Sequence, residues 1–233
     1  MVYFMFSNKL YFAEMPGLVA YFPLDSVHGR NDISPYQASN VTASAVNLGS
    51  GPANDPRGSY YFRGDISSYL SFPTSLIDQL DTRFSITVMA WAYGQTDGPL
   101  FAYSANGVNV FYKSAPAIYC GIKSRLSSAI KVLEQPLEGN RWRHFTCSYD
   151  YSSGVQTLWV DGKPMMSKNV GSFEIQTTNE ARTGARRQGD RKYFKGNVAD
   201  LRVYNRALHQ EEILAAIKWR TLRNGKGKDK ISF

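Results

Sequence analysis

The sequence predicts an all-β protein, a sandwich of two antiparallel sheets, and three features indicate this. Strand-forming residues are frequent, with 14% aromatic residues in the chain of 233. Short apolar segments follow one another with turn residues between them, and helical periodicity is scarce. The 43% hydrophobic content is enough for one domain with a large core.

The strands are expected where apolar and aromatic residues form short segments between Gly, Pro, Asp and Ser turns. The polar stretch 26–57 is expected to be a loop along one edge. Only 208–219 has helical spacing, which predicts one short helix near the C-terminus. The expected strands are 18–24, 59–64, 68–73, 84–94, 99–104, 108–113, 117–123, 128–134, 142–150, 155–163 and 196–205.

Charge and hydropathy suggest how the chain is divided: an extension over 1–15, one domain over 16–218 and a basic tail over 219–233. The net charge is +8, and residues 218–233 hold six basic residues and one acidic residue. The body is therefore nearly balanced, and the tail is expected to be solvated. We expect no nucleic-acid partner, because no recognition motif accompanies the charge. We also expect no membrane span, because no run of 18 apolar residues occurs, and residues 1–15 make a poor secretory signal.

The two cysteines, Cys120 and Cys147, predict one disulfide. If the strands around them form a simple meander, the cysteines lie two strands apart, roughly 9 to 10 Å, which is too far for a bond. A bond becomes possible if the middle strand of the three lies in the other sheet, and free buried thiols are the alternative. Asn40 begins an N-x-T glycosylation signal in a polar stretch, which points toward an exported protein.

Four segments in order resemble the laminin G-like and pentraxin-like group of concanavalin A-type jelly rolls. They are "GLVAYFPLD", "GSYYFRGDISSYLSFP", "RWRHFTCSYDYSSGVQTLWVDGKP" and "TGARRQGDRKYFKGNVADLRVYNRALHQEEI", and the resemblance spans 16–218. It implies a two-sheet jelly roll, often one module of a larger extracellular protein. Members of the group mostly bind glycans, matrix proteins or lipid head groups, commonly with calcium, and some relatives are glycoside hydrolases.

Asp200 is an acid within the apolar strand "GNVADLRVYN". Alternation places it on one face with Val198, Arg202 and Tyr204. The resemblance implies that an acid here helps to hold a structural calcium near the first strand, and Asp25 would be a second ligand. The alternative is that Asp200 caps a turn or pairs with Arg202 on the sheet surface, and the residues do not decide between calcium binding and this structural role.

A basic stretch, "ARRQGDRKYFKG", precedes this strand. Pentraxin-like relatives place calcium-binding acids and amides in this stretch, but here Arg186 and Arg187 stand where acids would be needed. Calcium-bridged ligand binding is therefore not expected in this chain. Guanidinium groups suit sulfate and carboxylate, which makes Arg186, Arg187, Arg191 and Lys192 candidates for binding an acidic glycan such as a glycosaminoglycan. The alternative is an ordinary solvated loop.

No catalytic residues are predicted. Glycosidases need two carboxylates facing one cleft, and the alternating E-x-D-x-x-E strand of laminarinase-type relatives is absent from the sequence. Glu174 and Glu180 come nearest to such a pair. We therefore expect a non-catalytic binding or adhesion module, extracellular and bound to a glycan or a matrix protein. A glycoside hydrolase or lyase of the same fold and a purely structural spacer are the alternatives.

Overall fold

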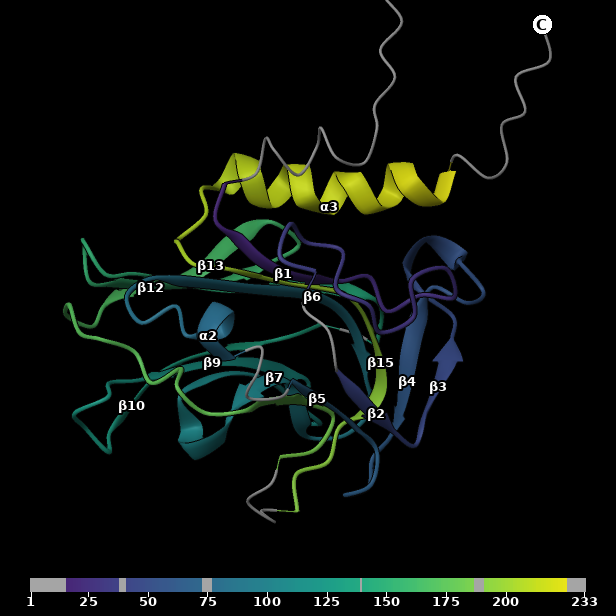
Figure 1. The fold of residues 1–233 in the computed structure, drawn as a ribbon, viewed down its shortest axis with the longest axis horizontal. Coiled ribbons are helices and arrows are strands. Elements are labelled where there is room, and N and C mark those ends of the chain that lie inside the picture. Colours follow the sequence, from purple (N-terminus) through teal and green to yellow (C-terminus); the bar gives the residue numbers. More distant parts are fainter. Residues whose placement is uncertain (1–15, 38–40, 73–76, 139, 187–190, 226–233) are drawn as a thin grey trace, which may run out of the picture.

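The computed structural model describes residues 16–37, 41–72, 77–138, 140–186 and 191–225. Two antiparallel sheets pack face to face, and a helix near the C-terminus lies along the outer face of one of them (Figure 1). The predicted fold class is confirmed. The predicted extension and the glycosylation signal at Asn40 lie outside the described residues.

The eight-stranded sheet contains both the first and the last strand of the described chain, and β1 pairs with β15. Its path runs in the order β13-β12-β11-β6-β15-β4-β3. Its strands are β1 (Leu18–Phe22), β3 (Val46–Gly49), β4 (Ser59–Arg63), β6 (Ile86–Gly94), β11 (Arg143–Asp150), β12 (Val155–Val160), β13 (Lys163–Asn169) and β15 (Lys195–Tyr204).

The seven-stranded sheet runs in the order β10-β9-β8-β7-β14-β5-β2. Its strands are β2 (Thr42–Ser44), β5 (Tyr69–Phe72), β7 (Gly98–Tyr103), β8 (Val108–Lys113), β9 (Ala117–Lys123), β10 (Ile130–Pro136) and β14 (Ala181–Thr183). The helical elements of the described chain are η1 (Pro52–Asn54), α2 (Ile77–Leu80), η3 (Ser104–Asn106) and α3 (Gln210–Gly225).

The main core fills the space between the two sheets, where inward side chains of both interdigitate. A second, smaller cluster lies on the opposite side of the eight-stranded sheet. There Ile213 and Ala216 of α3 pack on Tyr21, Met89 and Tyr204. The helix α3 therefore covers part of that outer face.

Several short or polar strands escape the sequence pattern. The stretch 26–57 contains β2 and β3, so it is not a loop throughout. Every residue of β13 is exposed, so this edge strand shows no apolar alternation. The helix extends beyond the predicted 208–219 segment to Gly225, so the first residues assigned to the tail are helical.

A β-bulge interrupts β15 at Asp200, where the pairing with β6 shifts register and the backbone has a positive φ of 58°. The extra residue reverses the alternation that the sequence predicts. Val198 therefore joins Leu201 and Val203 in the main core, whereas the prediction placed it on the opposite face.

Candidate functional site

A pocket of about 310 Å³ opens on the outer face of the seven-stranded sheet. Alternation along β8 sends every second residue into the core, so Asn109, Phe111 and Lys113 face outward. The strands β9 and β10 and two flanking segments complete the walls. The pocket is lined by Asn106, Asn109, Phe111, Lys113, Tyr119, Ile130, Arg186 and Lys192.

Two cations lie near the same aromatic ring in this pocket. The guanidinium carbon of Arg186 is 5.2 Å from the centre of the Phe111 ring, and the Lys192 ammonium is 5.8 Å from it. Both distances are typical of cation–π contacts. Arg186 also donates a hydrogen bond of 2.5 Å to Asn106 Oδ1, which fixes its orientation.

Acidic groups lie at the rim. Lys113 donates to Glu134 over 2.5 Å, and Asp97 accepts a bond of 2.6 Å from the Ser114 amide. Burial raises the pKa of Asp97, but the bonds from Ser114 and the charges of the nearby lysines outweigh it, so the pKa is lowered. None of the described residues that line the pocket is acidic, and three of them are basic.

Two neutral polar groups complete the lining. Asn109 is 2% exposed, and its Oδ1 has no hydrogen-bond partner among the described residues. Burial raises the pKa of Tyr119, so its phenol stays protonated at neutral pH. The pocket therefore offers cations, an aromatic wall, a hydroxyl and an amide acceptor.

The predicted basic candidates do not all lie in this pocket. Arg186 and Lys192 line it, Arg191 is exposed outside the lining, and Arg187 lies outside the described residues. Arg182 on β14, which precedes the basic stretch, stacks 4.3 Å above the Tyr69 ring and pairs with Glu180.

The pocket residues on β8 and β9 were missed by sequence reasoning. Alternation in "VNVFYK" places Asn109, Phe111 and Lys113 on one face, and that was the available signal. Nothing in the sequence shows that Arg186 packs over Phe111, because that contact depends on the path of a long connection.

Asp200, the acid that the sequence singled out, is 1% exposed and lies beneath α3. Its carboxylate accepts bonds of 3.0 and 3.2 Å from Arg202, and the Arg220 guanidinium on α3 is 3.9 Å away. Arg220 also donates to the carbonyls of Pro23 and Gly58, so it ties the helix to the body. The ion pair with Arg202 therefore forms, but it is buried and does not lie on the sheet surface.

Asp25 lies near this cluster, because the amide of Asp200 donates to the carbonyl of Pro23. One oxygen of Asp25 accepts bonds from the Val27 amide and from the amide and ring of His28. Asp200 in this arrangement does not fit a calcium ligand, because its carboxylate is bonded to a guanidinium group. No group of three acidic, His or Cys residues in the described ranges could hold a metal ion. Calcium at Asp25 and Asp200 stays a prediction, and the geometry gives it no support.

His144 lies buried beside this cluster, against Trp91 at a ring distance of 5.4 Å. Burial lowers the pKa of His144 to about 3, although Asp200 partly opposes that change. Above pH 6.5 the imidazole is neutral in both the folded and the unfolded chain. Below that pH only the unfolded chain takes up the proton, so stability falls as the pH drops toward 3.

We expect His144 to remove about 2 kcal/mol of stability between pH 7 and pH 5, from 1.36 kcal/mol per pKa unit. Urea unfolding at pH 5, 6 and 7 measures this loss. The variant His144→Phe keeps an aromatic ring that never titrates, so its stability should depend less on pH. Equal pH dependence in both proteins would show that His144 is not the group responsible.

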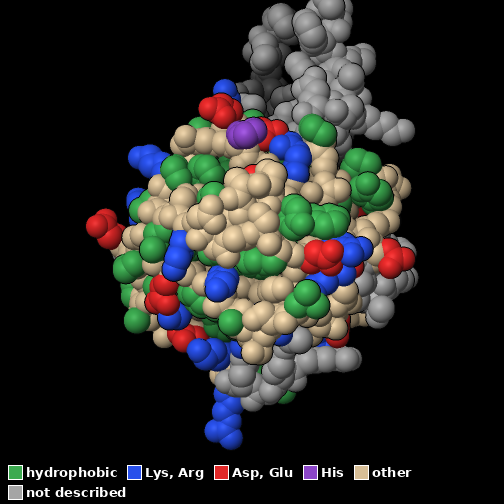
Figure 2. All heavy atoms as spheres, turned by 90° about the vertical axis from the view of Figure 1, so that its left-hand side faces the viewer, with side chains coloured by type: hydrophobic (Ala, Val, Ile, Leu, Met, Phe, Trp, Pro, Cys, Tyr) green, Lys and Arg blue, Asp and Glu red, His purple; other side chains and the backbone are tan. Residues whose placement is uncertain are grey.

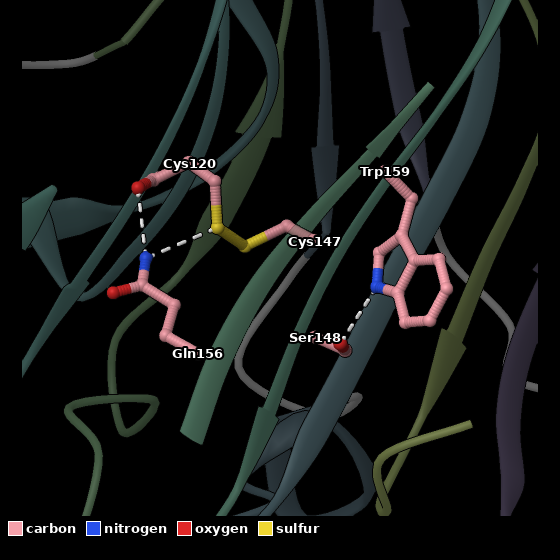
Figure 3. The surroundings of a disulfide bond; sticks show 5 residues. All are labelled: Cys120, Cys147, Ser148, Gln156 and Trp159. Atoms are coloured by element: carbon pink, nitrogen blue, oxygen red, sulfur yellow. Dashed lines mark hydrogen bonds between the residues drawn. A yellow bond between two sulfur atoms is a disulfide. The ribbon is translucent and has the colours of Figure 1, made fainter. Parts of the chain in front are cut away.

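The disulfide between Cys120 and Cys147 joins the two sheets, with Cα atoms 5.7 Å apart (Figure 3). The bond forms because β11 lies in the other sheet, while the middle strand β10 stays paired with β9. Gln156 donates to the Cys120 carbonyl over 2.8 Å beside the bond (Figure 3). The predicted bond is confirmed. The strand that lies in the other sheet is β11, however, and not the middle strand β10.

The two acids nearest to a catalytic pair have other partners. Glu174 pairs with Arg83 over 2.8 Å, while Glu180 pairs with Arg182 and accepts a bond from Ser71. The two arginines come from different elements, so each carboxylate belongs to an ion pair of its own. Neither acid lines the pocket.

Comparison with known proteins gives the family. The model of the concanavalin A-like lectin/glucanases superfamily matches residues 63–214. The chain belongs to this superfamily. The matched range contains both cysteines and every residue that lines the pocket.

Among curated proteins, the C-reactive protein of Sus scrofa is 23% identical over 177 residues, which cover 67% of this chain and 78% of that protein. Solved structures with the same fold include the binding domain of Paraclostridial Mosquitocidal Protein 1. It has a TM-score of 0.68 and 16% identity, and the match covers 85% of this chain and 51% of that one.

A binding domain of Botulinum neurotoxin DC, solved in complex with rat synaptotagmin II, has a TM-score of 0.63 and 12% identity over 85% of this chain and 50% of that one. The same domain was also solved with SialylT. The chain therefore spans about half the length of these solved structures. Identities this low show a shared fold.

In the part of the chain that the structure describes, no helix combines the length and apolar character needed to cross a membrane.

The side of the sandwich where β10 and β13 lie carries interspersed basic, acidic and hydrophobic side chains (Figure 2). Positive charge is therefore not concentrated in one patch on that face.

Proposed function

We propose that the chain is a non-catalytic binding module that recognises a glycan in the pocket on the outer face of the seven-stranded sheet. The observation that carries this proposal is the lining itself. It combines aromatic rings, an amide and a cation on strands with two further cations from the connection between β14 and β15, and such a mixed lining suits a ligand with many hydroxyls. The relatives named above are binding domains or a C-reactive protein, which supports binding without catalysis.

The proposal extends to location and context. The Cys120–Cys147 bond supports an oxidising compartment, because disulfides persist mainly outside the cytosol. The similar solved structures are about twice as long, which supports a role as one module beside other domains. The similar binding domain of Botulinum neurotoxin DC was solved both with SialylT and with rat synaptotagmin II, and the lining of the pocket in this chain favours a glycan over a protein.

A matched pair of tyrosine variants tests the site. Tyr119 lines the pocket, whereas Tyr61 on β4 has similar exposure and faces outward from the other sheet. We expect Tyr119→Ala to weaken glycan binding roughly tenfold through loss of its ring contact, and Tyr61→Ala to leave it unchanged. The measurement is binding to an immobilised panel of neutral and acidic glycans.

The same incubation tests catalysis, because released sugars can be measured in the supernatant. Equal binding by the two variants would remove the pocket from the site. A cleavage product would replace the binding proposal with a glycoside hydrolase or lyase.

A further inference from the structure

Two features of the pocket point to a narrower class of ligand. One is the pair of cations, Arg186 and Lys192, near the single ring of Phe111. The other is the buried Oδ1 of Asn109, which has no partner among the described residues. The cations favour an anionic group on the ligand, and the Asn109 oxygen favours a hydrogen-bond donor.

The cations call for an anion. Arg186 is oriented by its bond to Asn106 and by the ring beneath it, so little side-chain freedom is lost when it binds a ligand. Guanidinium and ammonium groups form their strongest hydrogen bonds with charged acceptors such as sulfate and carboxylate. None of the described lining residues is acidic, so the lining itself presents no carboxylate to such an anion.

Asn109 calls for a donor. A buried acceptor without a partner costs stability, and most such groups in folded proteins are satisfied by protein or by water. Asn109 lines a polar pocket large enough for a water molecule, so a ligand O–H or N–H bound there can supply the donor that Oδ1 lacks among the described residues.

The two requirements lie close together. Asn109 and Phe111 are two residues apart on one face of β8, which places their Cα atoms roughly 6.5 Å apart. One hexose ring with its substituents spans such a separation.

Building on the proposed function, we propose that the pocket binds an acidic sugar residue. Its sulfate or carboxylate contacts Arg186 and Lys192, and one of its hydroxyl or amide groups donates to Asn109 Oδ1. Arg186 and Lys192 thus select for charge, and Asn109 selects for a sugar over a bare anion.

Four small probes test this assignment by NMR titration: glucose, glucose 6-sulfate, glucuronic acid and inorganic sulfate. We expect the two acidic sugars to bind at least roughly tenfold more tightly than glucose, from charge-assisted hydrogen bonds, and more tightly than inorganic sulfate. Glucose binding as tightly as its sulfate would overturn the charge assignment. Inorganic sulfate binding as tightly as glucose 6-sulfate would overturn the role of Asn109.

Charge-matched variants locate the anion. Lys192→Gln and Arg186→Gln should each lower the affinity for glucose 6-sulfate roughly tenfold, because each removes a charge-assisted bond. Arg191→Gln removes the same charge from an exposed neighbour outside the lining and should have no effect. Lys192 is exposed, so that variant tests the proposal even if Arg186→Gln fails to fold. Equal losses in all three would mean that general charge attracts the anion and would reject the site.

Asn109→Leu separates a binding role from a structural one. It removes an unpaired buried acceptor, so the unfolding midpoint of the free protein should not fall, while the affinity for glucose 6-sulfate should drop roughly tenfold. Unchanged affinity would reject the role of Asn109. If neutral sugars bind in a Tyr119-dependent manner without preference for charge, the glycan site stands and the acidic ligand is wrong; if no sugar binds, both proposals fail.

Discussion

Replacing Asp200 with Asn should destabilise the protein by roughly 3 to 5 kcal/mol, because the change leaves the buried Arg202 and Arg220 without the carboxylate that neutralises them. Asn adopts positive φ as readily as Asp, so the bulge itself is preserved and the lost charge accounts for the effect. For a chain of this size the melting temperature should fall by roughly 10 °C. Thermal unfolding followed by circular dichroism measures it.

Asp65→Asn is the matched control. Asp65 also pairs with an arginine two residues away, Arg63, at 3.2 Å, but both side chains are nearly half exposed. Exposed pairs contribute about 1 kcal/mol or less, so this variant should unfold within a few degrees of the parent. Equal midpoints for the Asp200 variant and the parent would show that the carboxylate does not hold the two arginines. Repeating the scan with calcium and with chelator tests the calcium prediction, since a ligand of the folded state raises the midpoint.

The disulfide should contribute about as much to the free energy of unfolding as the Asp200 carboxylate does. It links residues separated by 27 positions, and closure of such a loop in the unfolded chain corresponds to roughly 3.5 kcal/mol in the chain-entropy model. The double variant Cys120→Ala with Cys147→Ala should therefore unfold at a lower denaturant concentration. Its denaturant dependence should also become steeper, because the unfolded chain without a cross-link exposes more surface.

Reduction provides the control for this pair. The parent protein, unfolded and refolded with a reducing agent, should reach the midpoint of the double variant, since both lack the cross-link. An unchanged midpoint in the double variant would show that the sheets are held together without the bond.

The strands that were predicted correctly are those with one face in the core. In "VNVFYK" or "AIYCGIK" alternation reports burial directly, because inward positions must be apolar. By contrast β13 contributes only exposed residues at a sheet edge, so its sequence reads as a polar segment. Its strand pairing comes from the backbone of β12, which the side-chain pattern does not record.

The bulge at Asp200 explains the largest error on β15. A single extra residue reverses the alternation, and no local pattern distinguishes a bulged strand from a regular one. The ion pair between Asp200 and Arg202 could be predicted as a possibility from their spacing. The contact with Arg220 could not be predicted, because Arg220 lies on α3, a separate element later in the chain. The sequence alone therefore supported a calcium ligand and an ion-pair partner equally as the role of Asp200. The packing of α3 favours the ion pair.

The candidate site was only half predictable. The basic stretch could be identified from composition, and Arg186 and Lys192 do line the pocket. Its partners on β8 and β9 have no motif, since a binding face of a sandwich is built from alternate residues of neighbouring strands. Only the strand order places Asn109 and Tyr119 beside the basic residues.

Ligand binding on the outer face of the seven-stranded sheet can be mapped by following backbone amide chemical shifts during titration with glucose 6-sulfate. We expect the largest changes on residues 106–113 and 117–123 and on Arg186 and Lys192. Changes confined to residues 23–34 or to α3, on the opposite side of the sandwich, would contradict binding on this face.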